Sequence, residues 1–221
     1  MTIFGYLLYL SRLPQKTLTV TGSAREKVIS DIAKWKSGYS VRVSEPNLQD
    51  GFKLMKSYEK IVLEIFKENG IDINQLDLSA ISVNEEYSDP QIKTERSYVL
   101  YQSIYLVTKD VQHVYEKSKN ITQRVLDTGI AFQSYPVEYY YSKLAEKRVQ
   151  LLSQAVRDAR KRAEEIAKSG GLKVGKVLSA KSGVVQVLAP NSVEVSDYGS
   201  YDTSTIEKEI MVTVNVVFEA K

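Results

Sequence analysis

The segment GGLKVGKV, from Gly170 to Val177, carries the residues whose types and spacing come closest to a nucleotide site. A phosphate-binding loop reads G-x-x-x-x-G-K-[ST], and Gly170, Gly175 and Lys176 stand at its glycine and lysine positions. Such a loop follows a strand and opens a helix, because backbone N–H groups at the helix start hold the phosphates. Here a helix is expected to end at Gly170 and Gly171, and Val177 replaces the hydroxyl residue that would bind magnesium. We therefore interpret the glycines as a helix C-terminal cap and expect no nucleotide binding.

Few other side chains in the sequence suit catalysis. The 221 residues include no cysteine, which excludes thiolate nucleophiles, disulfides and zinc–thiolate sites, and the one histidine is His113. Adjacent carboxylates at Glu85-Glu86 and Glu164-Glu165 are typical of solvated charged surfaces, and no G-x-S-x-G nucleophile motif is present. The sequence thus predicts no catalytic residue, no metal ligands and no cofactor, and we expect a protein that is not an enzyme.

A basic run, RDARKR, occupies Arg157 to Arg162 and could in principle bind a nucleic-acid backbone. Opposite charges recur in and after it at i,i+4 spacing, which is typical of a solvated helix face. The pairs are Asp158–Arg162, Arg160–Glu164 and Lys161–Glu165. Because the net charge of the chain is only +3, we expect no nucleic-acid partner.

Tyrosine is the most common aromatic residue, with 15 copies against five Phe and one Trp. A tyrosine ring packs while its hydroxyl stays in water, which suits partly exposed sheet faces and interfaces. In the run Tyr139 to Tyr141, strand alternation points Tyr140 away from its two neighbours, so the three rings form no flat platform. A ligand-binding or enzymatic site built from scattered tyrosines and carboxylates is the alternative to a non-catalytic role.

The N-terminal residues 1–16 contain an unbroken apolar run, IFGYLLYL, followed by Arg12 and Lys16. Eight residues are too few to cross a bilayer, which takes about 20 in a helix. The run is either a segment docked on the domain or the end of a membrane anchor that begins before this chain. On the second interpretation its membrane-facing residues are Ile3, Phe4, Tyr6, Leu7, Leu8, Tyr9 and Leu10.

Alternating and helical periodicities predict the framework that positions these residues. Strands are expected at LTVTG, at WKSGYSVRV, at LDLSAISV, at RSYVLYQSIYLVT, at FQSYPVEYYY, from near Val174 and at the C-terminal IMVTVNVVFEA. Pro136 is expected to place its strand at a sheet edge or a bulge. Long amphipathic helices are expected from Asn47 to Gly70, from Asp110 to Gly129 and from about Ser142 to Lys168. We expect one α+β domain over residues 17–221: a mostly antiparallel sheet of about seven strands with the three helices packed on one side.

The third helix carries an apolar stripe at alternating spacings of four and three. Its members are Ala145, Val149, Leu152, Val156, Ala159, Ala163 and Ile166. Alanine also recurs at every fourth position from Ala155 to Ala167, so a neighbouring layer can approach this helix closely. The expected core comprises Trp35, Val156, Ala159, Ala163, Val214 and Val216.

Three segments, in this order, resemble the SIMPL-domain family: LTVTGSAREKVISDIAKW from Leu18, DARKRAEEIAKSGGLKVGKVLSA from Asp158, and IMVTVNVVFEA from Ile210. The shared pattern is a T-V-x-G first strand, an Asp-Ile-Ala entry to the second strand, an A-x-x-x-A helix that runs into G-x-x-x-G-K-V, and a valine-rich last strand. The resemblance covers about residues 16–220. Ser30 departs from it, since similar proteins often have proline or alanine before the aspartate.

This resemblance implies a location and a mode of action, but no catalytic residues. Similar proteins are bacterial or archaeal envelope proteins, exported or held by one N-terminal transmembrane segment, and some assemble into large homo-oligomeric rings. Their names often link them to envelope or oxidative stress. We therefore expect a non-catalytic protein on the extracytoplasmic face of the membrane, in the periplasm or at the cell surface. It would be tethered through its N-terminal segment and act through homo-oligomeric assembly or partner binding.

Overall fold

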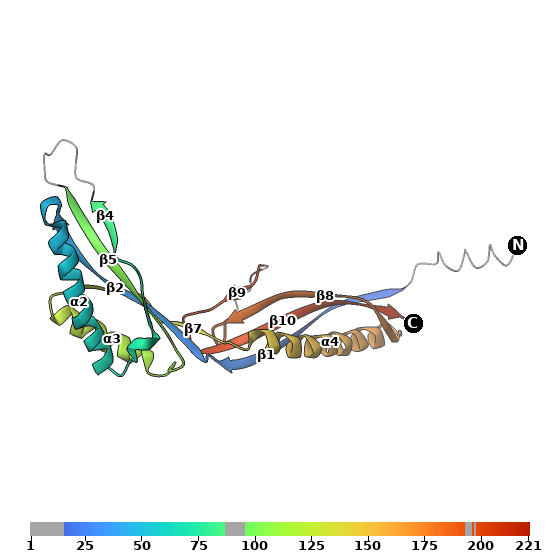
Figure 1. The fold of residues 1–221 in the computed structure, drawn as a ribbon. Coiled ribbons are helices and arrows are strands. Elements are labelled where there is room, and N and C mark those ends of the chain that lie inside the picture. Colours follow the sequence, from blue (N-terminus) through green and yellow to red (C-terminus); the bar gives the residue numbers. More distant parts are fainter. Residues whose placement is uncertain (1–15, 87–95, 193–195, 197) are drawn as a thin grey trace, which may run out of the picture. The chain divides into compact units, whose positions relative to one another are not determined.

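The computed structural model describes residues 16–86, 96–192, 196 and 198–221 (Figure 1). These residues form three α-helices and ten β-strands, which confirms the α+β class and corrects the expected count of about seven strands. The additional strands are short. They include β3 (Leu76–Leu78), β6 (Ala131–Ser134), β7 (Glu138–Tyr140) and β9 (Ser200–Tyr201). The expected strand LDLSAISV is divided into β3 and β4 (Ser82–Glu86), the expected strand FQSYPVEYYY is divided into β6 and β7, and β9 was not expected.

The described chain forms two compact units, each with its own sheet and core, where the sequence led us to expect one domain with one sheet. The first unit contains Met1–Val28, Lys143–Asp202 and Glu207–Lys221. The second contains Ile29–Ser142 and Thr203–Ile206. Periodicity along a strand shows which of its faces is buried, but it does not show which sheet the strand joins.

The first unit is a four-stranded sheet with one long helix, α4 (Leu144–Ser169), along it (Figure 1). The strand order is β1-β10-β8-β9. Strand β1 is Thr17–Ile29, β10 is Glu207–Ala220 and β8 is Val174–Leu188. Strands β10 and β8 pair antiparallel along most of their length, whereas β8 and β9 pair in parallel at only two positions.

Small residues let α4 lie directly on this sheet. Ala155, Ala159 and Ala163 are fully buried in a core that they share with Val216 of β10. On β1, a Cβ added to Gly22 would lie 2.1 Å from the carbonyl oxygen of Ala155 and 2.5 Å from the backbone nitrogen of Ala159. Helix and strand backbones are therefore in contact at Gly22, where only a hydrogen atom fits. The expected close approach along the alanine row is confirmed.

The buried face of α4 nevertheless differs from the expected stripe. Leu151 and Ala167 complete the buried row, whereas Val149 and Ile166 are 68% and 52% exposed. Val156, which was expected in the core, is half-buried at its margin. Where the sheet lies closest to the helix backbone, at Ala155 and Ala159, there is room for alanines but not for larger side chains, whereas Leu151 is buried one turn earlier.

The second unit is a six-stranded antiparallel sheet, with α2 (Leu48–Glu68) and α3 (Val114–Asp127) covering one face (Figure 1). Its path is β3-β5-β2-β6, and β4 and β7 pair with β5 and β2. Strand β2 is Ile32–Ser44, β4 is Ser82–Glu86 and β5 is Ser97–Thr108. Short 3-10 turns at residues 45–47 and 73–75 flank α2.

Trp35 lies in the core of this second unit. Its ring stacks on that of Phe66 from α2, with ring centroids 5.3 Å apart. The buried residues Ala159, Val214 and Val216 belong instead to the core of the first unit. The single core expected from the sequence is therefore two cores, and the three helices divide between two sheets.

The contact between α4 and the sheet can be tested by enlarging an alanine. We expect Ala159→Leu to lower the free energy of unfolding by roughly 1–3 kcal/mol, because the added carbons have no space between helix and strand. Urea unfolding followed by circular dichroism measures this loss. The matched control is Val149→Leu on the exposed side of the same helix, which should change the stability by less than about 0.5 kcal/mol. An equally neutral Ala159→Leu would show that the alanine row is not packed as described.

Candidate functional site

The glycine turn at Gly170 and Gly171 ends a helix and does not open one. Gly170 is the C-terminal cap of α4, and Gly171 has a positive φ of 69°. The Leu172 N–H donates to the carbonyl of Ala167 over 2.8 Å. The Gly171 N–H donates to the carbonyl of Lys168 over 3.2 Å. These two bonds are those of a Schellman motif, so the interpretation as a C-terminal cap is confirmed. The absence of nucleotide binding stays a prediction.

His113 lies in an exposed charged cluster before α3. Its Nδ1 is 2.6 Å from Asp110 Oδ1, and Lys117 Nζ is 2.9 Å from the other oxygen of that carboxylate. Hydrogen bonds from Lys117 and His113 lower the pKa of Asp110. The His113 side chain is 74% exposed. Within the described part of the chain, no group of three or more His, Asp or Glu residues is placed to hold a metal ion.

The basic run on α4 is a solvated and partly ion-paired surface, as expected. Arg162 Nε lies 2.8 Å from Asp158 Oδ2, and an Arg160 nitrogen lies 3.8 Å from Glu164 Oε1, so two of the three expected pairs form. The adjacent carboxylates at residues 85–86 likewise each pair with an arginine. Charges of this kind stabilise helix and strand surfaces only slightly, and they bring no reactive groups together.

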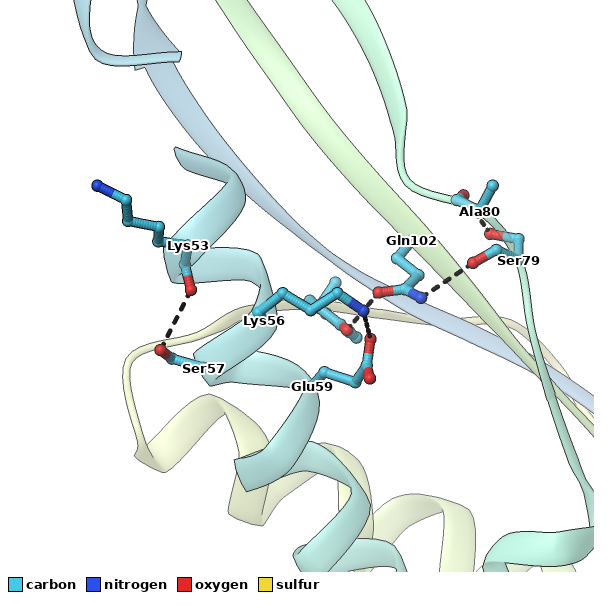
Figure 2. A network of polar contacts seen from close by, with 8 residues as sticks. Lys53, Lys56, Ser57, Glu59, Ser79, Ala80 and Gln102 are labelled. Carbon is cyan, nitrogen blue, oxygen red and sulfur yellow. Dashed lines mark hydrogen bonds and ion pairs between the residues drawn. The ribbon is translucent and has the colours of Figure 1, made fainter. Parts of the chain in front are cut away.

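A buried polar network lies between β2, β5 and the end of β3 in the second unit (Figure 2). The hydroxyl of Tyr39, which has no exposed surface, donates to Gln102 Oε1 over 2.6 Å. Gln102 Nε2 donates in turn to the carbonyl of Ser79 over 2.9 Å. Burial and the negative charge of Glu59 raise the pKa of Tyr39 well above its ordinary value. Because the phenol is sealed from solvent, the network holds the sheet together and offers no chemistry to a ligand.

The first unit contains a buried ammonium group at Lys208, whose side chain has no exposed surface. It donates to the backbone carbonyl of Asp202 and lies 3.3 Å from the carboxylate of the same residue. Its Nζ is also 5.6 Å from the centre of the Tyr201 ring. Burial lowers the pKa of Lys208, and Asp202 partly opposes this shift. The charge is compensated locally, as a structural ion pair requires.

The uncovered face of the second unit's sheet carries lysine and tyrosine side chains. Strand register places Lys34 opposite Val107 and Lys36 opposite Tyr105. Because successive side chains of a strand point to opposite faces, these residues point away from Trp35 and the helices. The expected orientation of Tyr140 is confirmed, since its neighbour Tyr139 is buried in the core while Tyr140 contacts Lys34 outside it.

The two lysine ammonium groups lie over aromatic rings. Lys34 Nζ is 4.5 Å from the centre of the Tyr140 ring. Lys36 Nζ is 5.0 Å from the centre of the Tyr135 ring and 5.6 Å from that of Tyr105. Contacts of this kind are favourable by about 0.5–1 kcal/mol at exposed positions. They hold two flexible side chains on one surface.

A groove of about 910 Å³ opens at these rings and extends to Tyr115 of α3, on the helix-covered side of the sheet. Strands β6 and β7 both pair with β2, but Tyr135–Val137 interrupts the ladder between them, and Pro136 has no N–H to donate. The edge or bulge expected at Pro136 is confirmed. We call this surface the tyrosine–lysine groove and define it by Lys34, Lys36, Tyr105, Tyr135, Glu138 and Tyr140.

Sequence reasoning did not find this groove. The alternating K-W-K pattern at residues 34–36 carried a signal, because a buried Trp35 requires both lysines to point the other way. The rings that complete the groove come from β5 and from the β6–β7 segment, about 70 and 100 residues farther along the chain. No local pattern brings these segments together.

The expected membrane-facing segment, Ile3–Leu10, lies outside the described residues. Of the helices that the structure describes, none is both long enough and apolar enough to cross a bilayer.

The buried network gives a testable stability effect. We expect Tyr39→Phe to lower the free energy of unfolding at pH 7 by roughly 1–3 kcal/mol, because Gln102 Oε1 is left buried without a donor. The raised pKa means that the folded chain keeps the Tyr39 proton above pH 10 while the unfolded chain loses it. This contribution to stability is complete below pH 10 and is lost as the pH rises further, so the difference between wild type and variant should shrink there. Urea unfolding at several pH values measures it.

The matched control for this experiment is Tyr198→Phe, since Tyr198 is 96% exposed. It should change the stability little at any pH. A Tyr39→Phe variant as stable as this control would contradict the described network.

One protein-family model matches nearly the whole described chain. The model of the SIMPL family, described as a protein of unknown function (DUF541), matches residues 18–218. The match therefore spans both compact units and includes the alanine row, the glycine cap and the last strand. No curated protein shows significant similarity to the chain. On the strength of the family match, the chain belongs to the SIMPL family of proteins of unknown function.

Proposed function

We propose that the protein is a non-catalytic component of the cell envelope that acts through homo-oligomeric assembly or partner binding. The observation that carries the proposal is the open edge of β8 in the first unit. From Val174 to Val185, this strand pairs with β10 on one side, and no second strand pairs with it among the residues that the structure describes. An open edge presents unpaired N–H and C=O groups to which another strand can add.

The side chains on this edge fit such a contact. Val177, Leu178 and Val184 of β8 are exposed apolar residues. The opposite edge strand, β1, is engaged by α4, because the Ser23 N–H donates to Asp158 Oδ2 over 2.9 Å. Helix α4 reaches β8 at the start of that strand, where Arg160 donates to the Gly175 carbonyl over 3.4 Å. We therefore assign the assembly contact to β8, and a second copy of this chain is the partner that the resemblance to ring-forming proteins favours.

The non-catalytic part of the proposal is supported by where the perturbed ionisable groups lie. Tyr39 is sealed inside its network, Lys208 is buried against Asp202, and Asp110 is hydrogen-bonded to Lys117 and His113. These groups come from separate places in two units. Catalytic sites usually gather perturbed groups in one cleft.

The envelope location rests on the N-terminal sequence and on the family resemblance. The apolar run at residues 3–10 ends before Arg12 and Lys16, which is a pattern typical of a membrane boundary. We propose that this run is the end of an anchor that holds both units outside the cytoplasm. A role in envelope or oxidative stress would fit this location.

The β8 edge is tested by adding charge to it. We expect the wild-type chain, of 25.0 kDa, to form a complex of several copies in analytical ultracentrifugation. The double variant Val177→Lys with Val184→Lys should shift this complex toward monomer, because lysine on an edge strand opposes pairing with a like strand.

The control variant is Ile61→Lys with Ile73→Lys, which adds the same charge at exposed apolar positions of the second unit. It should leave the complex intact. A wild-type chain that is monomeric at every concentration would contradict homo-oligomeric assembly. An edge variant that assembles like the control would contradict the choice of β8.

The N-terminal segment is tested by deletion. We expect removal of residues 1–13 to leave the circular dichroism spectrum and unfolding midpoint nearly unchanged while lowering association of the protein with phospholipid vesicles. A second variant, Leu7→Ser with Leu8→Ser in the otherwise complete chain, should also weaken vesicle association. If the deletion unfolds the protein, the run is a docked part of the fold and the anchor proposal is wrong.

A further inference from the structure

The tyrosine–lysine groove contains two positive charges and one negative charge, because Glu138 is the cross-strand neighbour of Lys34, whereas Lys36 lies opposite Tyr105. Among the described residues, neither Lys34 nor Lys36 forms an ion pair. Their ammonium groups make cation–π contacts with the faces of tyrosine rings. Three other exposed lysines of the second unit differ in this respect, since Lys53, Lys56 and Lys119 each pair with a carboxylate. The groove therefore presents cations whose charges remain available.

The walls of the groove are mainly carbon. Rings of Tyr105, Tyr135 and Tyr140 line it together with the aliphatic side chains of Val107 and Ile206. Its volume of about 910 Å³ lies within the usual range for small-molecule sites. An apolar body would gain by covering these rings, whereas a fully hydrated ion would not.

We propose that this groove binds a small organic anion: an apolar or aromatic body that carries one carboxylate, sulfonate or phosphate group. Lys34 and Lys36 lie two residues apart on one face of β2, so their Cα atoms are about 7 Å apart. One anionic group placed between their ammonium groups can accept from both. The body then lies against the rings of Tyr105, Tyr135 and Tyr140.

Three features prepare the groove for such a ligand. The ring contacts already restrict the two lysine side chains, which lowers the entropy lost on binding. The interruption of the ladder at Pro136 opens the sheet edge where the body would enter. Glu138 Oε2 accepts a hydrogen bond from the Tyr140 hydroxyl over 2.8 Å, and strand register places this negative charge beside Lys34, so a bound anionic group would lie nearer to Lys36. A ligand with a second anionic group would be repelled there, so a single anionic group is preferred.

A pair of fluorescent probes tests this inference on the full chain. The first is 8-anilinonaphthalene-1-sulfonate, and the second is N-phenyl-1-naphthylamine, the same ring system without the sulfonate. We expect the wild-type protein to bind both and to bind the anion more tightly. Lys34→Gln with Lys36→Gln should weaken binding of the anion by about tenfold and that of the neutral probe by less than about twofold.

The ring contribution is tested separately. Tyr105→Ala should weaken the binding of both probes by a similar factor of about three to ten, because it removes apolar surface and no charge. Added salt should weaken binding of the anionic probe to the wild type and have less effect on its binding to the double lysine variant. Competition by decanoate and by 1-naphthoate then shows whether an aliphatic or an aromatic body is preferred, and displacement by either supports the site.

Controls keep the outcome clear. Lys53→Gln with Lys56→Gln removes two paired lysines of α2 and should leave binding of both probes unchanged. Circular dichroism and the unfolding midpoint establish that each variant is folded. Equal binding of the anion by wild type and by Lys34→Gln with Lys36→Gln would overturn the proposal, as would a wild-type protein that binds neither probe. The β8 edge variant should bind the probes like wild type, so this site and the assembly contact can fail independently.

Discussion

The packing of the first unit depends on a backbone-to-backbone contact between α4 and β1. Gly22 lies against the main chain of the helix at Ala155 and Ala159, so neither element can move closer or carry a larger residue there. This constraint explains why the helix presents alanines to the sheet at this point. Strand β10 buries a large side chain, Phe218, which is fully buried and contributes about 1.5–3 kcal/mol to the free energy of unfolding.

A single close helix leaves much of the first unit's sheet uncovered. The face away from α4 carries polar side chains beside Val217, and Asn215 Nδ2 donates to Thr21 Oγ1 across β10 and β1. A polar face remains in water without cost, whereas the open edge of β8 carries exposed valine and leucine side chains. Assembly through the edge is therefore physically better motivated than assembly through the face. The uncovered face of the second unit's sheet is different, because it holds aromatic rings and lysine ammonium groups.

Local features of this fold could be predicted from the sequence because they depend on a few neighbouring residues. Each helix ends at a glycine with positive φ, at Gly70, Gly129 and Gly171, as the E-N-G, D-T-G and S-G-G motifs indicate. The alanine row, the bulge at Pro136 and the opposite orientations of Tyr139 and Tyr140 also follow from local spacing.

The division into two sheets could not be predicted in this way. Strand β10 pairs with β8, which shortly precedes it in the sequence, and with β1 at the other end of the chain. Strand β2 pairs with β5, β6 and β7. Alternation is the same whichever partner is chosen, so one sheet and two sheets fit the sequence equally well. The tyrosine–lysine groove was missed for the same reason, because its rings reach Lys34 and Lys36 only after those pairings are made.

Lysine serves two opposite purposes in this chain, and the difference lies in solvation. Lys208 is removed from water, so its charge must be compensated from within by Asp202, and burial still lowers its pKa. Lys34 and Lys36 remain in water and rest on ring faces, which direct an ammonium group without neutralising it. A compensated charge is sufficient for structure alone, because any further anion would have to displace its partner. An oriented charge that forms no ion pair can accept an anion at lower cost, which is why the groove on the second unit, and not the buried pair in the first, is where a ligand of this protein should be sought.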